Sequence, residues 1–104
     1  TSQGAANQSS ITAIGSVVEG TVVTLALSRV GADIAMYIDG VDATDTAGVH
    51  VDPVATTNTM KVGIRENLVS EPLNGPISAV KIFSYALNAD QQMQKHINLS
   101  NNWE

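Results

Sequence analysis

The sequence predicts an all-β chain that folds as an antiparallel sandwich and ends in one short helix. Two runs in which apolar and polar residues alternate, "VVTLALSR" and "IAMYI", are typical of strands with one covered face. Turn signals that contain glycine separate the apolar runs along most of the chain. A helical period appears only after Asn88. Strands first and a helix last favour an antiparallel sandwich over alternating strand–helix units.

Composition excludes several classes of function. The 104 residues suffice for one domain, and the net charge is −5 with only five Lys and Arg, which are scattered singly. Without a basic stripe, we expect no nucleic-acid partner. The apolar runs are too short for a membrane span, so we expect no membrane insertion. Cysteine is absent, which excludes disulfides, thiol catalysis and zinc sites built on cysteine.

The first half of the chain contains the clearest strand patterns. Residues 1–10 are small and polar without a period, so we expect a flexible lead-in or linker before a domain at residues 11–104. One strand is predicted over Ile11–Val18. The alternating runs Val22–Arg29 and Ile34–Ile38 are expected to pair as a hairpin. Within the first of these runs, one side carries the apolar residues Val23, Leu25 and Leu27 and is the predicted covered face.

Turn chemistry and shorter runs define the rest of the sandwich. Gly31 is available for the positive φ of the hairpin loop, and Asp39-Gly40 is a dipeptide that favours a second chain reversal. The acidic, turn-rich stretch Val41–Asp52 has room for two short strands. Further strands are predicted over Met60–Ile64 and, from a strong run of β-forming residues, over Ile77–Phe83.

The final segment carries the signals of a helix start. Asn88 is a good N-cap, Asp90 lies in the first turn, and Gln91 occupies the capping-box position. The predicted apolar stripe has four-residue steps and consists of Ala89, Met93 and Ile97.

Two phrases, in this order and at this spacing, carry a resemblance to a known family. "GTVVTLALSRVGADIAMYIDGV", followed by "LNGPISAVKIFSYALNADQQMQ", resembles the laminin-G-like branch of the concanavalin A-like sandwiches, a jelly-roll family. The resemblance covers about Gly20 to Ile97. The matching positions of the first phrase are Gly20, Leu25, Leu27, Gly31, Tyr37, Asp39 and Gly40. Those of the second are Gly75, Ile77, Val80, Ile82, Phe83, Ala86, Leu87 and Asn88.

The chain departs from the family pattern in two ways. Val22 stands where the family has tryptophan, and at most one strand precedes the first phrase where the family has several. We therefore expect either a minimal version of the fold or the C-terminal part of a larger jelly roll. In the second case the open sheets need cover, so self-association or packing against the rest of a larger chain is expected.

Three acidic residues form the candidate cation site. Asp39, Asp42 and Asp45 are spaced by three, and some relatives of this fold bind calcium through carboxylate oxygens. The alternative is a solvated acidic loop, in which Asp39 serves the turn. No other cofactor is expected.

Aromatic side chains are the candidate ligand contacts. Tyr37 and Trp103 offer flat faces on which a sugar ring stacks, with packing in the core as the alternative for Tyr37. No catalytic residue is predicted, because Glu66 and Glu71 lie in a predicted loop and match no paired-carboxylate motif. His50 belongs to no metal motif.

Together these features favour a non-catalytic binding or adhesion module of an extracellular, cell-surface or virion protein. The resemblance implies a glycan or a protein as its ligand. The alternative is a purely structural component of a larger assembly, such as a phage tail or capsid accessory protein.

Overall fold

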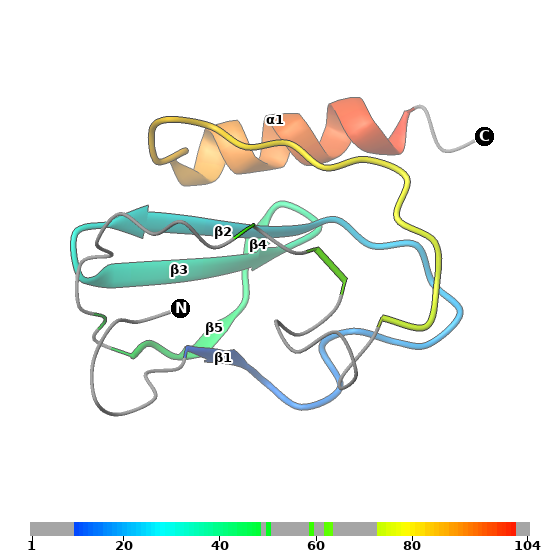
Figure 1. Ribbon diagram of the computed structural model, residues 1–104, viewed down its shortest axis with the longest axis horizontal. Coiled ribbons are helices and arrows are strands. Elements are labelled where there is room, and N and C mark those ends of the chain that lie inside the picture. The colour runs from blue at the N-terminus through cyan, green and yellow to red at the C-terminus, as the bar shows by residue number, and fades with distance from the viewer. Residues whose placement is uncertain (1–9, 49, 51–58, 60–61, 64–72, 102–104) are drawn as a thin grey trace.

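The computed structural model describes residues 10–48, 50, 59, 62–63 and 73–101. Within these residues, short antiparallel strands form two sheets, and one helix lies beside them (Figure 1). The sheet β1-β5 pairs Ile11–Thr12 with Thr44–Thr46. The second sheet has the order β2-β3-β4, from Leu25–Val30, Asp33–Ile38 and Val41–Asp42. The predicted fold class, antiparallel strands in a small sandwich with a C-terminal helix, is confirmed.

The predicted hairpin is present, and its register explains the loop. Strand β2 pairs with β3 from Leu25 opposite Ile38 to Val30 opposite Asp33, which leaves Gly31 and Ala32 as a two-residue loop. Gly31 has φ +58°, the glycine-first arrangement that such loops use. The first strand begins at Leu25, three residues later than its predicted start at Val22.

The Asp39-Gly40 turn is also confirmed. Both residues have positive φ, 51° at Asp39 and 80° at Gly40, which is the type I′ pattern whose twist matches antiparallel strands. Ile38 pairs with Val41 on either side of the turn. Residues 36–40 therefore form the end of β3 and the turn that leads into β4.

Two predicted strands differ from the structure. The strand at Ile11–Val18 stops at Thr12, because the chain turns back at Ala13–Ser16 with Gly15 at φ +82°. Ile77–Phe83 forms no strand within the described chain, because no neighbouring strand there bonds to its backbone. Of the predicted Met60–Ile64, residues 60, 61 and 64 lie outside the described residues, as does most of the lead-in at residues 1–10.

Helix α1, Ala89–Ser100, begins as predicted. The Gln91 backbone N–H donates to Asn88 Oδ1 over 2.9 Å, and the Asn88 N–H donates to Gln91 Oε1 over 3.0 Å, which completes the capping box. Among the described residues, no helix is long and apolar enough to cross a membrane.

The predicted apolar stripe of α1 is only partly correct. Met93 is half-buried, but Ala89 and Ile97 are exposed, and the buried residue of the helix is Gln92. The rotation of α1 follows from its approach to Gly40, where the backbone of Met93 lies so close that a Cβ would meet it at 2.7 Å. A stripe of three apolar residues predicts the buried face of a helix only weakly, and the close contact with Gly40 determines it here.

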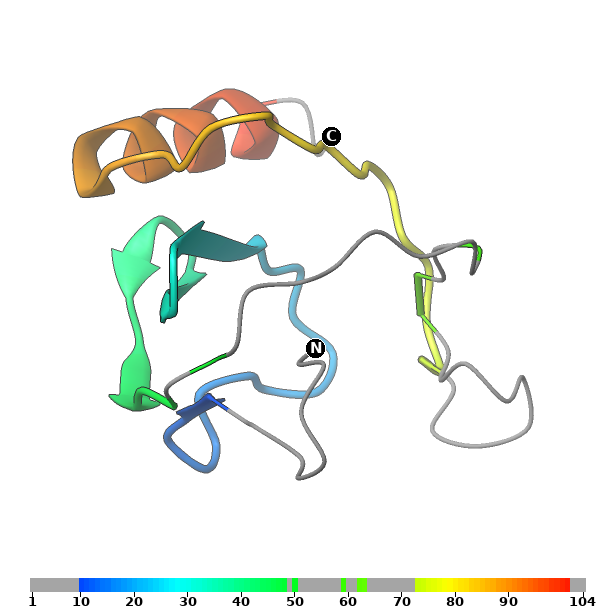
Figure 2. The same ribbon diagram turned by 60° about the vertical axis from the view of Figure 1, so that its left-hand side comes forward.

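The buried apolar set among the described residues is small. It consists of Ile34, Tyr37 and Leu87. The predicted covered face of β2 is instead open, since Leu25 is 64% and Leu27 60% exposed. The later part of residues 73–88 runs alongside α1 in both views, and the segment forms no strand beside β2 (Figures 1 and 2).

Candidate functional site

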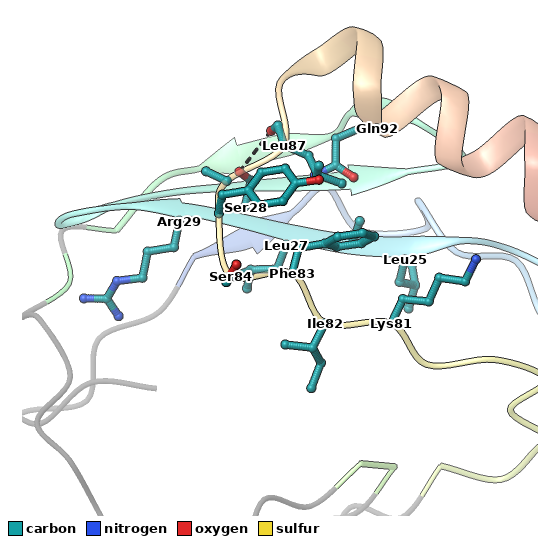
Figure 3. Close-up of a pocket in the computed structure, with 13 residues that line it drawn as sticks. Leu25, Leu27, Ser28, Arg29, Lys81, Ile82, Phe83, Ser84, Leu87 and Gln92 are labelled. Atoms are coloured by element: carbon teal, nitrogen blue, oxygen red, sulfur yellow. Dashed lines mark hydrogen bonds between the residues drawn. The ribbon is translucent and has the colours of Figure 1, made fainter.

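One concave feature lies between β2 and the chain that leads into α1. A cavity of about 480 Å³ separates Leu25–Arg29 from residues 81–87, with Gln92 of α1 beside it (Figure 3). This volume lies within the usual range for ligand pockets, about 300 to 1,000 Å³. We call this cavity and its lining the β2 groove. Its apolar lining consists of Leu25, Ala26, Leu27, Ile82, Phe83, Tyr85, Ala86 and Leu87.

Among the described residues, both long walls of the β2 groove present backbone groups without backbone partners. Strand β2 is at one end of the order β2-β3-β4, so one row of its N–H and C=O groups faces away from β3. On the opposite wall, the backbone from Asn74 to Ala86 makes no hydrogen bond to the backbone of another described residue. At the closed end, the Ser28 hydroxyl donates to the Leu87 carbonyl over 3.1 Å and joins the two walls.

Charges around the β2 groove are of one sign. Lys81 and Arg29 lie at opposite ends of it in Figure 3, and no Asp or Glu is among the described residues that line it. The Lys95 ammonium lies 5.3 Å from the centre of the Phe83 ring, a cation–π contact. Phe83 in turn packs edge-on against Tyr85, with 5.9 Å between ring centres. A chain with net charge −5 therefore has a locally basic, aromatic groove.

A second cavity contains one of the predicted ligand contacts. It has a volume of about 350 Å³, and Tyr37, Ile34 and Asp33 of β3 contribute to its lining. Tyr37 is only 7% exposed, so its ring packs in the core and presents little surface to a ligand. Trp103, the other predicted contact, lies outside the described residues.

The three predicted cation ligands do not converge. Thr24 N–H donates to Asp39 Oδ1 over 2.9 Å, Thr44 N–H donates to Asp42 Oδ1 over 2.9 Å, and Asp45 lies on β5. Asp42 and Asp45 are three residues apart on nearly extended chain, where such side chains point to opposite faces. In the described part of the chain, no three His, Cys, Asp or Glu residues form a group that could hold a metal ion. Two of these carboxylates accept hydrogen bonds within turns, and the cation site stays a prediction from the sequence.

Two histidines hold distant segments together. His96 Nδ1 lies 3.0 Å from Thr24 Oγ1 and 3.7 Å from Asp39 Oδ1, which connects α1 to the β3–β4 turn. His50 is buried, and its Nε2 lies 3.0 Å from Ser10 Oγ. The Ser10–His50 pair has no orienting acid on His50 Nδ1 among the described residues, and neither cavity is lined by it. Within the described residues the pair therefore has no third group of the kind that nucleophilic catalysis needs.

The groove between these two walls was not predicted from the sequence. The β-prone run "PISAVKIFSY" is predicted as a strand, so an open wall was not expected there. The signal that could have identified this wall is Lys81 within that run, since a charged residue in an apolar strand marks an edge or an open face.

The fold and the two phrases agree with comparisons to known proteins. A family profile described as the concanavalin A-like lectin/glucanases superfamily matches residues 1–91. No curated protein matches the sequence significantly. The chain is similar to the crystal structure of an S-layer domain-containing protein from Clostridium thermocellum, with a TM-score of 0.58 and 21% identity. That similarity covers 83% of this chain and 44% of the other, so this chain spans less than half the length of that structure, and it concerns the fold alone. Because the profile matches most of its length, the chain belongs to the concanavalin A-like lectin/glucanases superfamily.

Proposed function

We propose that this chain is a non-catalytic binding or adhesion module of an extracellular, cell-surface or virion protein, and that it holds a protein or glycan ligand in the β2 groove. The observation that carries the proposal is the lining of this groove. Apolar and aromatic side chains line the groove together with the cationic side chains of Lys81 and Arg29. Binding sites commonly combine such an apolar lining with a few polar groups that orient the ligand.

The same lining supports binding over hydrolysis. Glycoside hydrolysis usually needs two carboxyl groups across the bond that breaks. Among the residues that the structure describes, none with a carboxylate lines the β2 groove. Glu66 and Glu71, the acidic pair considered from the sequence, lie outside the described residues.

A binding screen tests the proposal. The purified 104-residue chain is applied to arrays of glycans and of surface proteins, and each hit is measured with the Phe83→Ala variant. Loss of an aromatic anchor is expected to weaken binding by about tenfold or more. The matched control is Ile14→Ala, which truncates a fully exposed apolar residue outside the groove and leaves affinity unchanged. Turnover of any glycan hit, or equal binding by both variants, contradicts the proposal.

A structural role in an assembly is the second candidate, and one observation favours it. Apolar side chains on both walls are open to solvent, among them Leu27 at 60% and Ile82 at 71% exposed. Apolar surface of this kind is stabilised when another chain, or another part of the same protein, covers it. Sedimentation of the purified chain at micromolar concentration tests this role. Self-association with cooperative melting only in the assembled form supports it, whereas a stable, cooperatively melting monomer overturns it.

A further inference from the structure

We propose that Asn74-Gly75 is a self-modification site, at which Asn74 converts spontaneously into aspartate and isoaspartate through a succinimide. This inference goes beyond the proposed function and does not depend on which ligand the chain binds.

The two residues lie in an open bend. Asn74 and Gly75 are exposed, as are Leu73 and Pro76 on either side of them. Among the described residues, Asn74 and Gly75 make no backbone hydrogen bond, and no described group bonds to the Asn74 carboxamide. No atom lies within 4 Å of the position that a Cβ on Gly75 would take. The described structure therefore leaves the Asn74 carboxamide and the Gly75 nitrogen able to approach each other.

The chemistry needs only these two residues and water. The Gly75 backbone nitrogen loses its proton and attacks Asn74 Cγ, so that an N–Cγ bond forms, the Cγ–Nδ2 bond breaks and ammonia leaves. The reaction is intramolecular, which favours it once the two atoms can meet. Water then opens the succinimide at either carbonyl. Opening at Cγ gives aspartate, and opening at the original main-chain carbonyl gives isoaspartate, in which the main chain passes through Cγ.

The second dipeptide with this chemistry, Asp39-Gly40, is held by its neighbours. Its succinimide forms with loss of water instead of ammonia. The Asp39 carboxylate accepts from the Thr24 N–H over 2.9 Å, and the Asp39 N–H donates to the Thr24 carbonyl over 2.9 Å. Gly40 lies so close to α1 that a Cβ would meet Met93 Cα at 2.7 Å. Ring closure at Asp39 therefore requires the turn to leave these contacts, whereas ring closure at Asn74 breaks no contact between described residues.

The isoaspartate product changes the contacts of the bend. The Leu73 N–H donates to the Gly63 carbonyl over 2.6 Å, and Ile77 Cδ1 lies 3.2 Å from the position of a Cβ added at Gly63. The residues on both sides of Asn74 therefore approach the same glycine. Isoaspartate inserts one additional main-chain atom between them, which loosens this arrangement. Aspartate leaves the main chain unchanged and adds only one negative charge.

The test measures conversion in the purified 104-residue chain, incubated at neutral pH and body temperature. Mass spectrometry of the tryptic fragment 66–81 follows the gain in mass at Asn74 and distinguishes aspartate from isoaspartate. The same chain in guanidinium chloride gives the unfolded rate. We expect the folded and unfolded rates at Asn74 to agree within about threefold, because local opening of an exposed bend costs almost nothing. Isoaspartate formation at Asp39 is expected to be slower by about tenfold or more in the folded chain.

Two variants assign the reaction to the Gly75 nitrogen. Gly75 has no left-handed φ and has open space around it, so Gly75→Ala is expected to keep the fold. Its methyl group hinders the attack, and a small increase in the barrier suffices to slow conversion by about tenfold or more. The matched control is Ser78→Ala, which truncates an exposed residue of the same segment and is expected to leave the rate unchanged. Circular dichroism checks that both variants are folded.

Each outcome supports or overturns the inference. Protection of Asn74 by about tenfold or more in the folded chain overturns it, since local opening must then be costly. Conversion of Gly75→Ala as fast as that of the unaltered chain also overturns it, because the nitrogen is then not the attacking group. Hydrogen exchange tests the structural consequence. We expect the Leu73 amide to exchange faster in the isoaspartate form than in Asn74→Asp, and equal exchange contradicts the loosening of the contact with Gly63.

Discussion

Two regions beside the β2–β3 hairpin differ in how many of their polar groups form hydrogen bonds within the described chain. At the β3–β4 corner, made by Thr24, Asp39, Gly40, Met93 and His96, backbone and side chains bond to one another and α1 closes over the turn. Along the β2 groove, backbone groups face a cavity and apolar side chains are open. The contacts of the corner are made within this chain, whereas the groove leaves apolar side chains exposed.

Two residues, Asp39 and Gly40, allow the turn to pack against its neighbours at the corner. Asp39 N–H donates to the Thr24 carbonyl over 2.9 Å, and its carboxylate accepts from the Thr24 N–H over 2.9 Å, so the turn continues the ladder by one pair. Gly40 leaves room for α1 to approach the turn. Among the described residues, the walls of the β2 groove are joined by one hydrogen bond, between Ser28 and Leu87. We therefore expect substitutions at the corner to cost more stability than those in the groove.

Gly40→Ala is expected to have the largest effect on this contrast. The residue has φ +80°, and an added Cβ meets Met93 Cα at 2.7 Å. The left-handed backbone costs about 1 to 2 kcal/mol, and overpacking adds about 1 to 3 kcal/mol. We expect the free energy of unfolding to fall by about 2 to 5 kcal/mol in a urea titration.

Gly31→Ala separates the cost of the left-handed backbone from the cost of overpacking. Gly31 has φ +58°, but no atom lies within 4 Å of an added Cβ. Only the backbone cost applies, so a loss of about 1 to 2 kcal/mol is expected. Equal losses in the two variants mean that α1 does not rest on the β3–β4 turn.

Truncation of a buried leucine and of an exposed leucine compares how much each surface contributes to stability. Leu87 is 7% exposed, and Leu87→Ala is expected to cost about 2 kcal/mol, because it empties part of a small core. Leu27 is 60% exposed, and Leu27→Ala is expected to change stability by less than about 0.5 kcal/mol. Urea titration of both variants makes the measurement. A large loss in Leu27→Ala indicates that the groove is filled in solution, by a second copy or by a part of the chain outside the described residues.

Local chemistry explains which parts of the structure the sequence could predict. The Gly31 loop, the Asp39-Gly40 turn and the Asn88–Gln91 capping box depend on residues within a few positions of one another, and all three are confirmed. The pairing partner of Ile77–Phe83 and the rotation of α1 depend on distant segments. A period of apolar residues cannot specify these, because several faces of the chain are almost equally apolar.

The candidate site shows the same limit. Tyr37 and Asp39 are candidates from the sequence because they lie in a phrase that matches the family. In the structure, Tyr37 is buried and Asp39 accepts a hydrogen bond from the Thr24 N–H beside a turn. The β2 groove exists because two apolar segments separated by more than fifty residues fail to pair. A failure to pair leaves little trace in either segment alone, and Lys81 within the second segment is a weak local sign of it.

Asp39 itself offers a smaller test of the corner. In Asp39→Ala, the Thr24 N–H loses its acceptor, and alanine is less favourable than aspartate at φ 51°. A loss of about 1 to 2 kcal/mol is expected by urea titration. Asp39→Asn keeps the acceptor and the tolerance for positive φ, so it is expected to retain most of the stability. If asparagine is as damaging as alanine, the charge of Asp39 matters, and the contact with His96 is more important than the bond to Thr24.

The smallest expected effect concerns Asp42, just beyond the corner. Hydrogen bonds from the Thr44 backbone N–H, and then from its side chain, hold the pKa of the Asp42 carboxyl below its ordinary value of 3.8. Because the folded pKa is depressed, the contribution of these bonds to stability is fully present above that ordinary value and is lost as the pH falls through the folded pKa. Asp42→Asn removes this titration while other carboxyl groups continue to titrate. The stability difference between the chain and Asp42→Asn, from urea titrations between about pH 6 and about pH 3, is therefore expected to stay constant at first and then to change in favour of the variant in acid. A difference that stays flat to the lowest pH shows that the Thr44 bonds do not favour the ionised carboxyl, and that the acidic turn contributes only solvated charge beside a corner that is stabilised by other contacts.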